Sequence, residues 1–232
     1  GLALHLEPAA QAEGPGGRAA AAAPSAGDDL EQLAYAVSHD LQEPLQLINR
    51  NARLLSTRSG EQMDEDGRRF LDHLIHSGER LQGMLDGILS YSRVGFHKGR
   101  PETIDLAEVA DAVLADLGPQ LEEVGGEVRR GPLPRVEAEP NAMRQLFFNL
   151  IANAVKFRGE RPLRVNVGAQ AEGDWWRLVV QDNCIGIDPR FQDAVFGMFQ
   201  RLHTESEYPG TGIGLAICRK IVEQYGGRMW VQ

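Results

Sequence analysis

Apolar positions recur at spacings of three and four through the first part of the chain. Over residues 30–55 they form one stripe, which predicts a long amphipathic helix with Asp28 or Asp29 as its cap. Pro44 falls inside this helix and is expected to bend it, because proline removes one backbone hydrogen bond. A second stripe covers residues 70–88, after a polar connection. Two such helices predict an antiparallel hairpin, which a second copy would complete as a four-helix bundle.

From residue 99 the pattern alternates between strands and helices. Strands are predicted at ETIDL, within EVRRGPLPRVEAEP, and at LRVNVGAQ and WWRLVVQDN, with a hairpin turn at AEGD between the last two. Helices are predicted at AEVADAVLADLGPQLEEVG, at NAMRQLFFNLIANAVKF with Asn141 as its cap, and at TGIGLAICRKIVEQYGG before a last strand, RMWVQ. This order predicts a two-layer α/β sandwich behind the helical hairpin, and so an α+β chain.

The same patterns divide the chain into three segments. Residues 1–27 are rich in Ala, Gly and Pro, which predicts a linker or a disordered segment. Residues 28–98 contain the hairpin, and residues 99–232 contain the sandwich. The composition of the whole, 232 residues with 42% hydrophobic and 25% charged, is that of a soluble protein.

Charge and cysteine content narrow the classes of partner. The formal net charge of −9 argues against nucleic acid, because phosphate binding favours clustered Lys and Arg. No apolar run reaches the roughly 20 residues of a membrane-spanning helix, and no signal peptide is visible. Cys184 and Cys218 give neither a disulfide framework nor metal-ligand spacing, so a cytoplasmic protein is expected.

His39 lies off the apolar stripe, in the stretch YAVSHDLQEPL. It is two residues from both Val37 and Leu41, about 200° around the helix from each. This position disfavours a buried structural histidine. Periodicity alone favours an ordinary solvated histidine over a catalytic one.

Two stretches of the second half have the character of a nucleotide site. In NLIANAVKF, Asn149 and Asn153 share a helix face with Lys156; amide oxygens suit Mg²⁺ and a lysine suits phosphate. In DNCIGI, Asp182 ends a strand, where a carboxylate can accept from an exocyclic amine, and Gly186 lets the backbone approach a flat ring. Taken singly, each stretch can also be interpreted as solvated helix residues or as a plain turn.

A third stretch, GTGIGL, is a glycine-rich loop that opens a helix. Bare backbone N–H groups and the helix dipole favour phosphate at such a place. The loop fits neither the dinucleotide fingerprint nor the P-loop, so it indicates a phosphate loop of another ATP fold. We refer to it as the phosphate loop; it comprises Gly210, Thr211, Gly212, Gly214 and Leu215.

Together and in this order, these stretches resemble the sensor histidine kinases of two-component signalling, over residues 28–232. SHDLQEPL resembles the phosphoacceptor box, NLIANAVKF the asparagine box, DNCIGI and GTGIGLAIC the two glycine boxes, and FGMFQRLH the phenylalanine box. The phosphoacceptor box separates the chain from the gyrases, mismatch-repair ATPases and heat-shock chaperones of the same ATPase superfamily. Within the kinases, the chain looks most like the phytochrome type.

The resemblance implies a homodimeric kinase that uses ATP and Mg²⁺. His39 would accept the γ-phosphoryl group, with Asp40 hydrogen-bonded to its other ring nitrogen, and pass it to an aspartate of a response regulator receiver domain. An upstream sensory domain is expected on the same full-length protein. Residues 198–209 would form a lid over ATP. The remaining implied contacts are Asn149 and Asn153 with Mg²⁺, Lys156 and the phosphate loop with the phosphates, Asp182 with the adenine amine, and Gly186 with the adenine ring.

Two residues depart from the family pattern. Cys184 replaces the first glycine of the first glycine box, where a positive φ would cost about 1 kcal/mol or more, so weaker ATP binding is expected. Glu43 stands where the family commonly has Thr or Asn; its carboxylate would repel a phosphoryl group, which predicts weak phosphatase activity. The family also normally continues beyond Gln232 into a glycine-rich turn and a strand.

Two other interpretations stay open at this point. Cys184 motivates a nucleotide-binding dimeric scaffold that signals without catalysis, which acid-labile phosphate on His39 would exclude. A structural helical dimer with an unrelated α/β domain requires all five boxes to be accidental. A shift of the melting temperature with nucleotide would exclude that second interpretation.

Overall fold

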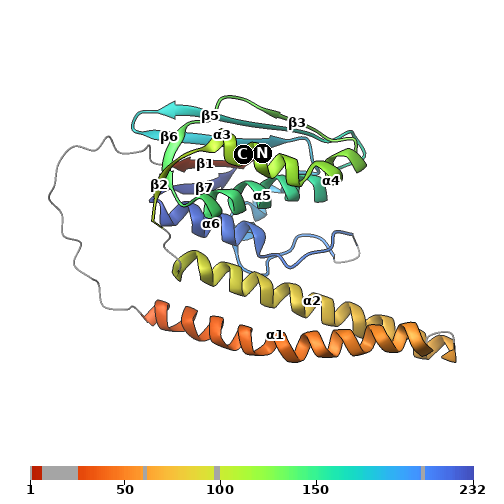
Figure 1. The fold of residues 1–232 in the computed structure, drawn as a ribbon. Coiled ribbons are helices and arrows are strands. Elements are labelled where there is room, and N and C mark those ends of the chain that lie inside the picture. Colours follow the sequence, from red (N-terminus) through yellow and green to blue (C-terminus); the bar gives the residue numbers. More distant parts are fainter. Residues whose placement is uncertain (1, 7–25, 60–61, 97–99, 205–206) are drawn as a thin grey trace. The chain divides into compact units, whose positions relative to one another are not determined.

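The computed structural model describes residues 2–6, 26–59, 62–96, 100–204 and 207–232 (Figure 1). The chain forms two compact units, which are described separately. The helical unit is Ala21–Arg93, and the sheet unit combines Gly1–Ala20 with Val94–Gln232. The N-terminal and C-terminal parts of the chain therefore belong to the same unit.

The helical unit consists of α1, Ala26–Ser59, and α2, Glu65–Phe96. Helix α1 begins before Asp28 and Asp29, so the prediction that one of them is the cap is wrong. Acidic residues are favoured in the first turn as well as at the cap, and composition could not separate the two positions. The helix continues through Pro44 to its end at Ser59.

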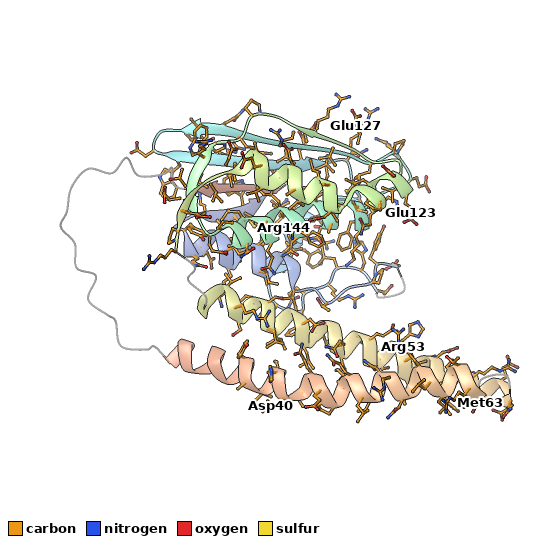
Figure 2. All side chains as sticks on the ribbon, in the orientation of Figure 1. Asp40, Arg53, Met63, Glu123, Glu127 and Arg144 are labelled. Atoms are coloured by element: carbon orange, nitrogen blue, oxygen red, sulfur yellow. The ribbon has the colours of Figure 1, made fainter. Side chains whose placement is uncertain are left out.

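Side-chain contacts between α1 and α2 confirm the antiparallel hairpin. Gln42 donates to Asp86 over 2.7 Å near one end, and Arg53 donates to Glu79 over 2.5 Å farther along. A side chain at Gly78 of α2 would overlap the Asn49 amide of α1. Figure 2 labels Asp40 and Arg53 along α1 and Met63 near the turn.

Large apolar side chains remain exposed on this hairpin. Within it Ala52, Leu71 and Leu89 are buried, but a larger apolar set is about half exposed. Contiguous exposed apolar surface of this kind marks an interaction site. The set, here called the apolar hairpin face, is Val37, Leu41, Leu47, Ile48, Leu54, Leu55, Phe70, Leu74 and Leu81.

The sheet unit has a five-stranded mixed sheet with the order β3-β5-β6-β1-β7 (Figure 1). Its strands are β1 Leu2–Leu6, β3 Glu127–Arg130, β5 Arg164–Glu172, β6 Trp175–Asp182 and β7 Arg228–Val231. A two-stranded sheet pairs β2, Glu102–Asp105, with β4, Arg135–Ala138. The helices are α3 Leu106–Asp116, α4 Gly118–Glu123, α5 Pro140–Lys156 and α6 Gly214–Gln224, with short 3₁₀ turns η2 Pro189–Phe191 and η3 Ala194–Phe196.

Burial confirms the two-layer sandwich. The buried residues are Val165 and Val167 on β5 and Leu178 and Val180 on β6, two apart on each strand, so they face the helices from one side of the sheet. The predicted hairpin turn between these strands contains Gly173 at φ 64°. The cap of α5 differs from the prediction of Asn141: the Glu139 carboxylate accepts from the backbone N–H groups at 141 and 142 over 3.0 and 2.7 Å.

The N-terminal strand β1 corrects the prediction that residues 1–27 form a linker or a disordered segment. Residues 2–6 lie between β6 and β7 and are antiparallel to both, with Leu4 opposite Leu178 on one side and Met229 on the other. Residues 7–25 of that segment lie outside the described residues. Five residues are too few for a strand pattern to stand out beside an Ala/Gly/Pro-rich tract, and both partners are distant in sequence.

A proline in β1 tests this placement. Because an interior strand residue donates its N–H to a neighbouring strand, Leu4→Pro removes a ladder hydrogen bond and should lower the melting temperature by roughly 5–10 °C. Leu4→Val keeps the donor and should melt within about 2 °C of the parent in differential scanning calorimetry. Equal melting of the two variants would show that β1 does not hold the sheet together.

Candidate nucleotide site and phosphoacceptor histidine

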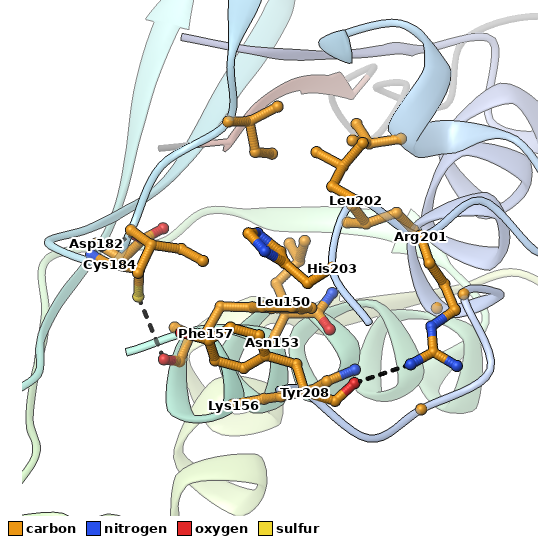
Figure 3. Close-up of a pocket in the computed structure, with 18 of the residues that line it drawn as sticks. Leu150, Asn153, Lys156, Phe157, Asp182, Cys184, Arg201, Leu202, His203 and Tyr208 are labelled. Carbon is orange, nitrogen blue, oxygen red and sulfur yellow. Dashed lines mark hydrogen bonds between the residues drawn. The ribbon is translucent and has the colours of Figure 1, made fainter. Parts of the chain in front are cut away.

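A cavity of about 410 Å³ opens in the sheet unit, where α5 ends and α6 begins (Figure 3). Its walls come from the end of α5, the end of β6 with the loop that follows, residues 200–203 and 208–212, the first turn of α6 and the end of β7. The predicted nucleotide residues that line it are Asn153, Lys156, Asp182, Gly186, Gly210, Thr211, Gly212, Gly214 and Leu215.

Asn149 is the one predicted nucleotide-binding residue that does not line the cavity, and it contacts the phosphate loop instead. Its amide donates to the Gly214 carbonyl over 3.4 Å. A Cβ on Gly214 would lie 3.8 Å from the Asn149 Cγ and 3.9 Å from the Asn153 Nδ2. The two amides of α5 therefore flank the first residue of α6.

The donor set at this place fits a magnesium ion that keeps most of its ligands from water and phosphate. Amide oxygens are hard ligands of the kind that Mg²⁺ accepts, and Mg²⁺ sites on nucleotides are commonly built from one or two protein groups. Among the residues that the structure describes, no three His, Cys, Asp or Glu side chains cluster to hold a metal without such help.

The loop after β6 forms the other end of the cavity. Asp182 accepts from the Cys184 backbone N–H over 2.9 Å, and the Ile185 N–H donates to the Phe157 carbonyl over 3.2 Å. Gly186 has φ 77°, a conformation that favours glycine. These bonds hold one face of the Asp182 carboxylate at the cavity wall.

Cys184 carries none of the backbone strain that we expected from the sequence. Within the described parts of the chain, Phe199 at φ 60° is the only non-glycine residue with a positive φ. The Cys184 thiol instead donates to the Ala154 carbonyl over 3.2 Å (Figure 3). Burial, with a smaller contribution from Asp182, raises the pKa of this thiol to about 12, so it stays protonated at neutral pH.

Lys156 stands against the phosphate loop. A Cβ on Gly210 would lie 2.4 Å from the Lys156 Nζ, and that nitrogen is 4.5 Å from the centroid of the Phe157 ring. Burial, and then the charge of Arg201, lower the pKa of Lys156. The cavity thus has a cationic end, opposite in charge to its Asp182 end.

Sequence reasoning missed several residues of this cavity. Arg201 could have been found, because it is the basic residue of FGMFQRLH, the stretch compared with the phenylalanine box. Phe157, His203 and Tyr208 also line the cavity and are half-buried. Phe157 and His203 belong to the stretches NLIANAVKF and FGMFQRLH, and Tyr208 to the predicted lid, but no sequence signal pairs these three rings, since they meet only when the segment after η3 folds back onto the end of α5.

His39 and Asp40 belong to the helical unit and do not line the cavity. Their side chains are 68% and 85% exposed, which agrees with the position predicted off the apolar stripe. The His39 Nδ1 lies 3.3 Å from the Asp40 Oδ1. That contact engages Nδ1 and does not involve the Nε2 nitrogen. Glu43 is exposed on the next turn of α1.

Two family models match the chain, one in each part. Residues 29–96 match the model described as "His Kinase A (phospho-acceptor) domain". Residues 138–232 match the model described as "Histidine kinase-, DNA gyrase B-, and HSP90-like ATPase". None of the described helices is long and apolar enough to cross a membrane.

Curated relatives include phytochromes and a sensor protein. The "Phytochrome-like protein Cph1" of Synechocystis sp. and the "Cyanobacterial phytochrome A" of Nostoc sp. are each 42% identical over 204 residues, which cover 88% of this chain. The "Sensor protein KdpD" of Escherichia coli is 30% identical over 198 residues. The chain spans 27% of the length of each phytochrome relative and 22% of the KdpD protein.

Solved structures share the fold. Full-length ShkA in complex with AMPPNP aligns with a TM-score of 0.62 at 24% identity, over 86% of this chain and 44% of that chain. The Acinetobacter baumannii histidine kinase AdeS aligns with a TM-score of 0.52 at 20% identity, over 83% of this chain and 94% of that chain. The phospho-acceptor model and the ATPase model match the chain one after the other, and the phytochrome relatives align with 88% of it. The chain therefore belongs to the sensor histidine kinases of two-component signalling.

Proposed function

We propose that this chain is a histidine kinase core that transfers the γ-phosphoryl group of ATP to His39 and then to an aspartate of a response regulator. One observation carries the proposal. A single cavity collects the acid, the amide, the lysine and the glycine-rich loop that ATP needs, in a chain that also presents an exposed histidine beside a carboxylate. In these terms, residues 28–98 are the dimerisation and phosphotransfer domain, and residues 99–232 are the ATP-binding domain.

The two ends of the cavity suit the two ends of ATP. Asp182 would accept from the adenine amine, and the backbone at Gly186 would lie against the adenine ring. At the cationic end, Lys156 and Arg201 would contact the phosphates together with the N–H groups of the phosphate loop. A bound Mg²⁺ beside Asn149 and Asn153 would neutralise charge on the phosphate oxygens.

The transfer itself needs little protein chemistry beyond position and charge. The Nε2 lone pair of His39 forms the P–N bond, and the bond from the γ-phosphorus to the bridging oxygen breaks, so that ADP leaves with that electron pair. Asp40 faces Nδ1 and stabilises the positive charge that develops on the ring. His39 is exposed, as a group that must meet a nucleotide bound to another unit has to be.

The same proposal names the partners. The apolar hairpin face would be covered by the hairpin of a second copy, which gives a homodimer with a four-helix bundle. The exposed surface around His39 would receive the response regulator. Because the phytochrome relatives are several times longer than this chain, an upstream sensory domain on the same full-length protein is part of the proposal. We place the kinase in the cytoplasm, where ATP is available and where its two cysteines can remain free thiols.

Labelling with γ-labelled ATP and Mg²⁺ tests the proposal directly. The parent should acquire acid-labile, base-stable phosphate, and His39→Gln should lose it entirely, because the proposal assigns the attacking nitrogen to His39. His76→Gln is a matched control, since His76 is exposed on α2 and its Nδ1 is bound to the Asp72 carbonyl. Label that survives in His39→Gln would assign the acceptor elsewhere.

Replacing Cys184 by glycine tests the scaffold alternative. Because Cys184 is unstrained and its thiol contacts Ala154, Cys184→Gly should leave the Kd for ATP within about twofold and lower the melting temperature by about 2–4 °C, through added freedom of the unfolded chain. Calorimetric titration and thermal melting measure both. An unlabelled parent with a labelled Cys184→Gly variant would favour the catalytically inactive scaffold instead.

A charge on the apolar hairpin face tests the homodimer. Leu74→Glu or Leu81→Glu would bury an unpaired carboxylate between two hairpins and should weaken dimerisation by about 100-fold or more. Gln46→Glu adds the same charge at an exposed polar position of α1 and should leave the dimer intact. Sedimentation equilibrium distinguishes the species; identical dimers in all three variants would remove this face from the interface.

A further inference from the structure

Three rings from two distant segments meet beside the cavity. Phe157 ends α5, while His203 and Tyr208 lie in the segment between η3 and α6 (Figure 3). The Phe157 ring centroid is 5.0 Å from that of Tyr208 and 6.1 Å from that of His203, and the His203 and Tyr208 rings meet edge to face at 5.1 Å. Rings at these separations attract one another beyond the area that they bury. We refer to these residues as the ring cluster.

Local hydrogen bonds bring the two lid residues of the ring cluster together. The Tyr208 N–H donates to the Thr204 carbonyl over 3.1 Å. The Glu207 carboxylate accepts from the Thr204 backbone N–H over 3.0 Å and from its hydroxyl over 2.8 Å. Thr204, Glu207 and Tyr208 are therefore bonded to one another, and the Tyr208 ring also contacts the Phe157 ring.

The start of the same segment is held by the phosphate loop. A Cβ on Gly212 would lie 2.7 Å from the Gln200 carbonyl oxygen and 3.0 Å from the Phe199 carbonyl carbon. Contact this close is possible only because residue 212 has no side chain. The segment is thus held at Gly212 on one side and at Phe157 on the other.

Arg201 lies between these two anchors. Its guanidinium donates to the Tyr208 carbonyl over 3.1 Å, so the position of Tyr208 contributes to where this charge lies (Figure 3). The Arg201 charge is near enough to Lys156 to lower the pKa of that amine. Two neighbouring cations repel each other, and an anion between them removes the cost, so the pair suits phosphate.

We propose that Tyr208 is a positioning residue for the nucleotide phosphates, which acts by packing on Phe157 and His203 and holding Arg201 beside Lys156 through its backbone carbonyl. The inference rests on the proposed function, because it concerns the same ATP site. Tyr208 contributes its ring and its carbonyl, and its hydroxyl has no part in the effect.

A double-mutant cycle with three ligands tests this assignment. Tyr208→Leu should raise the Kd for ATP by about tenfold, the effect of losing one charge-assisted contact, while the Kd for adenosine changes less than about twofold. Arg201→Met should weaken ATP by a similar factor. In the Arg201→Met background, Tyr208→Leu should add less than about a twofold loss, because residues that act as one unit are not additive.

Two further variants separate position from stability. Tyr208→Phe keeps the ring and should bind ATP as the parent does. Phe191→Leu removes an exposed ring of η2 outside the cavity and should also leave the Kd unchanged. Trypsin gives a second measure, since a displaced segment exposes the bond after Arg201: cleavage there should be several-fold faster in Tyr208→Leu and in Phe157→Leu.

The possible results distinguish a failure of the positioning role from a failure of the proposed function. Three results would each overturn the positioning role and leave the kinase in place. The losses of ATP affinity in the cycle could be additive, the Kd values for adenosine and ATP could rise equally, or Tyr208→Phe could bind ATP as weakly as Tyr208→Leu. A parent that binds no ATP would overturn the proposed function and this inference together.

Discussion

The packing of one face of α5 against the sheet is the constraint on which the ATP site depends. An apolar side chain that is fully buried contributes about 1.5–3 kcal/mol, so a stripe of them fixes both the axis and the rotation of the helix. Once that face is fixed, Asn149, Asn153 and Lys156 lie on one side of the end of α5. Phe157 is the C-cap of this helix. The buried stripe comprises Ala142, Met143, Leu146, Phe147, Leu150, Ile151 and Ala154.

Around the end of α5, close backbone approach replaces side-chain contact. Gly210 leaves room for the Lys156 amine, and Gly212 leaves room for the backbone at Gln200. Each of these glycines allows another segment of the cavity lining to come close to the phosphate loop. The phosphate loop is therefore both a set of N–H donors and the piece that holds the lid segment and α6 against α5.

The helical unit follows a different rule. Its two helices are joined by polar contacts and by a few buried apolar side chains, while the apolar hairpin face remains exposed. A hairpin that buries so little on its own depends on another surface for stability. His39 avoids that face, and its exposure beside Asp40 leaves one ring nitrogen accessible for reaction.

The sequence by itself determined what depends on local pattern: the two long helices, the strands of the sandwich, and the stretches that supply Asp182, Lys156 and the phosphate loop. Only the tertiary structure decided features that arise between segments far apart in the chain. Strand β1 needs β6 and β7 on either side, and Arg201, Tyr208 and Phe157 come into contact from separate segments of the chain. The unstrained backbone of Cys184 belongs with these features, because its loop is held by Phe157 and Ala154 of α5. Periodicity reports which side of an element is buried, but not which distant residue the exposed side will meet.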